Sequence, residues 1–170
     1  DRLAAIALLA PAFNRDKSDN DIRIRAKKLI VFINNLLQKY MPGKVSKYDD
    51  EFEPRAFGDN VQLWGSSTIL IESGGFKNDP GKEILRKMNY QILLSSFFAI
   101  ADNNYDSLKI ADYDSIPYNK KKFCDLLIRN GEIVTTKGNY ITDLAITLDR
   151  DLTGETVSHI EGKITEVGDL

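Results

Sequence analysis

The sequence predicts an α/β protein that carries a small all-β module at its C-terminal end. Over residues 1–103, apolar strand candidates alternate with long amphipathic helix candidates, which is typical of a sheet covered by helices. After residue 120 the pattern changes to three short strand candidates separated by turn signals. We therefore expect a partial mixed or parallel sheet with flanking helices, then a linker at 104–120, and then a small, incomplete β module at 121–170.

The first strand candidate runs from Leu3 to Ala10 and is apolar at every position. A strand that is apolar on both faces is typical of the centre of a helix-covered sheet. Pro11 ends this strand. Because this core-like sequence follows a single charged pair, we expect the chain to begin inside a larger domain.

The segment from Asp21 to Tyr40 predicts a helix that ends at Met41-Pro42-Gly43. Its apolar side chains recur at steps of three and four residues and form one stripe. The basic side chains fall largely off that stripe, so we expect a solvated face made by Arg23, Arg25, Lys27 and Lys28.

Residues 44–65 predict a long irregular segment, with a helical turn near Val61 to Trp64. Loops of this length are often functional. An acidic cluster within it lacks the residue spacing of a calcium loop, so we expect it to be solvated. Its members are Asp49, Asp50, Glu51 and Glu53.

A second strand is predicted from Thr68 to Glu72, directly before a Ser-Gly-Gly turn, and a helix follows from Asp79 to about Asn103. A strand that delivers one carboxylate into a turn is a common way to aim a general acid or base. Ligands of α/β sheets also gather at the carboxyl ends of strands. The alternative is a strand that simply ends at an exposed glutamate.

The C-terminal strand candidates are Cys124 to Val134, Tyr140 to Leu148 and His159 to Val167. Turn signals separate them at Asn130-Gly131 and at Lys137-Gly138-Asn139. These features indicate a small β module.

Composition limits the classes of partner. With 42% apolar residues, 28% charged residues and a net charge of −2, the chain is typical of a soluble globular protein. This charge gives no electrostatic case for nucleic acid or for an anionic membrane surface. No apolar run has the length of a membrane-spanning helix. The single cysteine excludes an intrachain disulfide, which leaves the compartment open.

The residue types also limit the chemistry. A zinc site needs three or four converging ligands, and the chain has one histidine, His159. Ser66, Ser67 and Ser73 have no histidine near them in the sequence, and the glycine-rich phosphate motifs are absent. From the residues alone, Glu72 is a well-placed carboxylate with too few partners to do chemistry by itself.

Two blocks carry a family resemblance: Tyr48–Asn60 (YDDEFEPRAFGDN) and Trp64–Gly75 (WGSSTILIESGG). They resemble the C-terminal part of a bacterial zinc metallocarboxypeptidase of the carboxypeptidase A-like superfamily. Leu8–Asn14 is similar to the strand and loop that follow the last zinc-binding histidine of that family. The resemblance covers residues 1–103.

This resemblance implies that Glu72 activates a zinc-bound water and then passes the proton to the leaving amine. Tyr48 lies upstream of it, as does a mobile-loop tyrosine of the family. The family's zinc ligands and its arginine clamp for the substrate carboxylate would precede residue 1. We therefore expect zinc and a peptide substrate for the full-length enzyme, and neither tight zinc nor hydrolysis for this chain alone. The resemblance is compatible with export, which no residue here indicates.

The C-terminal segments 125–134, 143–146 and 162–170 are similar to the small β-sandwich that flanks amidohydrolase barrels. Two alternatives therefore stay open beside the peptidase: a non-catalytic binding or assembly module, and an amidohydrolase-associated β domain. A free sheet edge or an apolar patch would also favour self-association of the chain.

Overall fold

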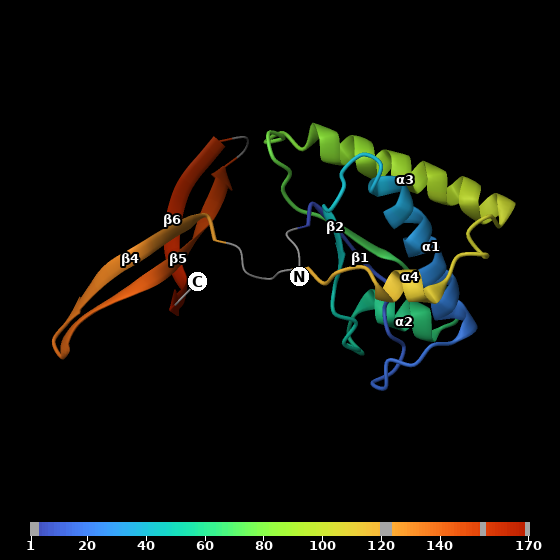
Figure 1. Cartoon of the computed structure of the whole chain (residues 1–170), viewed down its shortest axis with the longest axis horizontal. Coiled ribbons are helices and arrows are strands. Elements are labelled where there is room, and N and C mark those ends of the chain that lie inside the picture. Colours follow the sequence, from blue (N-terminus) through green and yellow to red (C-terminus); the bar gives the residue numbers. More distant parts are fainter. Residues whose placement is uncertain (1–3, 120–123, 154–155, 169–170) are drawn as a thin grey trace. The chain divides into compact units, whose positions relative to one another are not determined.

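The computed structural model describes residues 4–119, 124–153 and 156–168. The fold is mixed α/β, as expected, with two three-stranded sheets and four helices in the described part of the chain (Figure 1). The chain divides into two compact units, residues 1–120 and 121–170. No helix among the described residues is long and apolar enough to cross a membrane.

The first sheet has β1 (Ile6–Leu9) at its centre. β2 (Val45–Lys47) pairs with it in parallel, and β3 (Leu70–Ser73) pairs with it antiparallel on the other side. The sheet is therefore mixed. Ile6 and Leu8 are fully buried, which explains why β1 is apolar throughout.

Helix α1 (Asp21–Leu37) covers part of this sheet. Its start is fixed by Asn20, whose side chain accepts a hydrogen bond from the backbone N–H of Arg23. The predicted apolar stripe is confirmed in its main positions, because Ala26, Ile30, Ile33 and Leu37 are all buried. The helix ends three residues before the expected Tyr40.

The expected solvated face of α1 is wrong for two of its four basic residues. Arg23 is 0% exposed and Lys27 is 6% exposed. They lie four residues apart on one face of the helix, beside the apolar stripe. Their charges are paired with Asp19, and that of Arg23 with Asp50 as well, which removes most of the cost of burial. Arg25 is exposed, as expected.

Residues 44–65 are more regular than expected. They contain β2 and a short helix, α2 (Phe57–Leu63), which begins before the predicted turn at Val61. The following helix, α3 (Glu83–Asp102), is the long second helix that the sequence predicts. The buried Asp79 carboxylate accepts hydrogen bonds from the N–H groups of Ile84 (3.2 Å) and Leu85 (3.1 Å) at its first turn.

Residues 104–119, expected as part of a linker, pack within the first unit. They include a short helix, α4 (Ile110–Asp114), that contacts α1. They also extend beside β2, since the N–H of Lys47 donates to the carbonyl of Pro117 (2.8 Å) and the N–H of Asn119 to that of Lys47 (2.9 Å). Three of their side chains complete the core: Tyr105, Tyr113 and Ile116.

The second unit is an antiparallel sheet of β4 (Leu126–Thr135), β5 (Gly138–Thr153) and β6 (Thr156–Gly168). Three strands in this region were predicted, and their type and order are confirmed. A two-residue loop joins β4 to β5, because Thr135 pairs with Gly138. The Asn130-Gly131 signal corresponds to a register shift within β4 rather than to a turn between strands.

Candidate functional site

Strand register puts Tyr48 and Glu72 on one face of the first sheet. Ala7 of β1 pairs with Ser46 of β2 and with Glu72 of β3, so these three side chains form one row. Tyr48 follows Ser46 by two residues, and its N–H donates to the carbonyl of Leu8 (3.1 Å), which continues the pairing of β2. Tyr48 therefore points to the same face as Glu72.

The two side chains interact across β1. Neighbouring strands lie about 4.8 Å apart, so β2 and β3 are separated by about 10 Å, which a tyrosine and a glutamate can bridge. The hydrogen bond to the Glu72 carboxylate raises the pKa of Tyr48, and partial burial and the charge of Glu72 raise it further. A hydrogen bond with Asn119 acts in the opposite direction. Glu72 is exposed and Tyr48 is half-buried, so water can reach the carboxylate.

Two polar groups near this pair have no partner within the described part of the chain. They are Ser46 Oγ, in the same row as Glu72, and Asn119 Oδ1, on the residue that contacts Tyr48. Sequence reasoning missed both residues. Ser46 lies in a segment predicted to be irregular, and Asn119 in a predicted linker, so no local signal indicated either.

A buried ionic cluster holds the loop that follows Tyr48. The Arg23 guanidinium donates to the carbonyls of Lys17 (2.6 Å) and Ser18 (3.2 Å), and it forms an ion pair with Asp50. Burial would raise the pKa of Asp50, but Arg23 and then Lys17 outweigh it and keep that pKa below its usual value. These contacts tie Asp50, two residues after Tyr48, to helix α1.

Lys47 directly precedes Tyr48, so its side chain points to the opposite face of the sheet. There it also interacts with Asp50 of the ionic cluster. Its ammonium donates to the carbonyls of Tyr113 (3.2 Å) and Asp114 (2.8 Å) and lies 5.0 Å and 4.8 Å from the ring centres of Tyr113 and Tyr118. Burial lowers the pKa of Lys47. Because its ammonium is well partnered, we assign Lys47 to positioning the strand rather than to chemistry.

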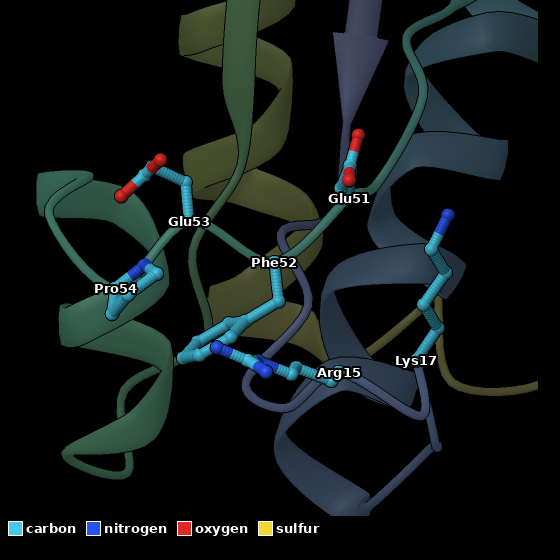
Figure 2. A pocket seen from close by; sticks show the side chains of 6 residues that line it. All are labelled: Arg15, Lys17, Glu51, Phe52, Glu53 and Pro54. Atoms are coloured by element: carbon cyan, nitrogen blue, oxygen red, sulfur yellow. The ribbon is translucent and has the colours of Figure 1, made fainter.

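An open pocket of about 530 Å³ lies beside the loops that follow β1 and β2. These loops leave the carboxyl ends of the two parallel strands, where α/β proteins commonly bind ligands. Figure 2 shows its six lining side chains, which come from both loops and carry both signs of charge. Hydrogen bonds from Arg55 lower the pKa of the lining residue Glu53 to about 2. The lining residues are Arg15, Lys17, Glu51, Phe52, Glu53 and Pro54.

Among the described residues, no group of three or more His, Cys, Asp or Glu side chains could hold a metal ion. The side chain of His159 lies outside the described part. Comparisons with protein families, curated proteins and solved structures found no match to this chain. The candidate site is therefore defined by its geometry, with the Tyr48–Glu72 pair at its centre.

Proposed function

We propose that this chain carries the general base and acid of a zinc metallocarboxypeptidase, with Glu72 in that role and Tyr48 beside it. The observation that supports the proposal most is their shared face across β1, with Glu72 exposed. The resemblance of Tyr48–Asn60 and Trp64–Gly75 to this family supports the reaction class. Residues 1–103 would then be the C-terminal part of a larger α/β domain.

In this proposal the Glu72 carboxylate takes a proton from the attacking water and gives it to the leaving amine. Its exposure supports this role, because both the water and the substrate must reach it. The raised pKa of Tyr48 keeps its hydroxyl protonated at neutral pH. The hydroxyl is therefore a hydrogen-bond donor that can orient Glu72 or a substrate carbonyl.

The family resemblance implies zinc, which lowers the pKa of a bound water and polarises a carbonyl group. The described residues do not supply a zinc site by themselves, because no suitable group of three ligands occurs among them. In our proposal the ligands come from outside these residues. We therefore assign no step to the metal.

The test is the release of a C-terminal amino acid from a peptide by the complete gene product, with zinc content measured in parallel. We expect Glu72→Gln to reduce the rate about 10²- to 10⁴-fold with zinc retained. Glu83→Gln is the matched control, because it makes the same charge change at an exposed position of α3. Full activity of the Glu72→Gln protein with zinc bound would exclude the proposed role of Glu72.

A second candidate function is binding or assembly without catalysis, in which Glu72 is only a strand-end residue. The exposed apolar side chains of α3 favour it. Hydrolysis that depends on Glu72 distinguishes the two, since a binding module would keep its association when Glu72 is replaced.

A further inference from the structure

Helix α3 is apolar on the face that points away from the core. Its inner face is buried and includes Leu85, Met88, Ile92 and Ala99. The outer face and its flanks carry six large apolar side chains, each between 42% and 67% exposed. Soluble monomers rarely expose a contiguous apolar surface of this kind without a partner. The six are Tyr90, Leu93, Leu94, Phe97, Phe98 and Ile100.

The size of this α3 face fits a dimer interface. With about 200 Å² for each aromatic side chain, the three exposed rings offer about 400 Å² of surface per copy. The three aliphatic side chains bring the total to about 600 Å², so two copies would bury about 1,200 Å², the lower bound for a stable interface.

The charges at the two ends of the α3 face are complementary to each other. Lys87 lies near the first turns of the helix and Asp102 is its last residue. Neither has an ion-pair partner among the described residues. With a rise of about 1.5 Å per residue, Lys87 and Asp102 lie about 11 Å and 12 Å on either side of Leu94 along the axis. A twofold axis near Leu94 would therefore set Lys87 opposite Asp102 of a second copy.

We propose that this chain forms a dimer in which α3 packs antiparallel against α3 of a second copy. Leu94 lies at the twofold axis, Tyr90 faces Phe98 of the second copy, and the Lys87–Asp102 pairs close the two ends. The observations favour a second copy as the partner because this one helix carries both the apolar face and the charges that match it. A parallel pair would set Lys87 against Lys87.

The first test is the mass of the full 170-residue chain by sedimentation, over concentrations up to about 100 μM because dimer populations depend on concentration. We expect a dimer, and we expect Phe97→Glu to raise its dissociation constant at least 100-fold. The matched control is Phe57→Glu, which makes the same change at a ring that is 79% exposed on α2 and should leave the dimer intact. A wild-type monomer across this range, or equal effects of the two variants, would overturn the proposal.

Charge reversal tests the antiparallel register. Lys87→Glu and Asp102→Lys each replace two attractive pairs per dimer with repulsive ones, so each should weaken dimerisation about tenfold. The double variant restores opposite charges and should recover most of the lost affinity. A double variant that is as weak as the single variants would contradict this register.

Cross-linking tests the position of the axis with little change to the surface. In a Cys124→Ser background, Leu94→Cys should form a disulfide between two copies on oxidation, because the introduced thiols meet at the axis. Ile84→Cys lies on the same helix, about 15 Å from Leu94 along the axis, and should not cross-link. Equal cross-linking at both positions, or none at Leu94→Cys, would reject the arrangement, and helix content measured by circular dichroism verifies that each variant is folded.

Discussion

Tyr48, which continues β2, and Glu72 of β3 lie on opposite sides of β1, the central strand of the first sheet, and their side chains interact across it. This relationship connects two predicted residues through strand pairing, which local sequence patterns do not reveal.

Replacing Glu72 with Gln should lower the pKa of Tyr48. The carboxylate raises this pKa through its hydrogen bond and its charge, and the variant removes the charge. A pH titration of ¹³C-labelled tyrosine by NMR measures the shift, and Tyr48→Phe assigns the resonance. An unchanged Tyr48 titration in the Glu72→Gln protein would show that the two side chains do not interact.

Asp50→Asn should reduce the free energy of unfolding by about 3–5 kcal/mol, because it leaves the buried Arg23 without its main counter-charge. Asp49→Asn is the matched control. Asp49 is exposed and forms its ion pair with Lys17 at the surface, so its loss should cost less than about 1 kcal/mol. Urea denaturation at pH 7 measures both values, and equal losses would contradict a buried role for the Arg23–Asp50 pair.

The Arg23–Asp50 pair also leads us to expect that the protein loses folding stability at acidic pH. The pKa of Asp50 is lower in the folded protein than its ordinary value of 3.8. The stabilisation that the ionised Asp50 contributes to the folded protein is therefore present above pH 3.8. It disappears as the pH falls through the pKa that Asp50 has in the folded protein. The difference in unfolding free energy between wild type and Asp50→Asn should shrink over this range, and a difference that stays constant would argue against the linkage.

The buried Tyr113 hydroxyl leads us to expect that the protein loses folding stability at alkaline pH. Burial raises its pKa from 10.0 to about 12, so the folded protein keeps a proton that the unfolded chain loses. This contribution is complete below pH 10 and is lost as the pH rises towards 12, with a size of about 3 kcal/mol. Tyr113→Phe should flatten the decline in unfolding free energy between pH 10 and 12. Tyr40→Phe, at a ring that is 56% exposed, should leave the decline unchanged.

Metal analysis of the 170-residue chain should find no stoichiometric tight zinc. The sequence has one histidine and one cysteine, and zinc sites prefer three or four converging ligands of these types or carboxylates. Inductively coupled plasma mass spectrometry after dialysis measures the content. One zinc per chain would contradict this prediction and would point to a ligand set that includes carboxylates.

Periodicity predicted the elements that depend on local pattern. The stripe from Ala26 to Leu37 and the uniformly apolar β1 are both visible in sequence, because burial against one neighbour imposes a fixed repeat. Arg23 was misassigned because its burial depends on Asp50, which is remote in sequence. The position of Glu72 near a strand end was predictable, but its contact with Tyr48 depends on the order of three strands and was not.

The return of residues 113–119 to β1 and β2 constrains when this protein can fold on the ribosome. Ala10 donates its N–H to the Tyr113 hydroxyl (3.5 Å), and the Lys47 ammonium is solvated by carbonyls of Tyr113 and Asp114. A nascent chain that stops before residue 113 has to bury Lys47 without those partners or leave the strand open to water. Co-translational folding of the first unit therefore finishes late, after most of its sequence has left the exit tunnel.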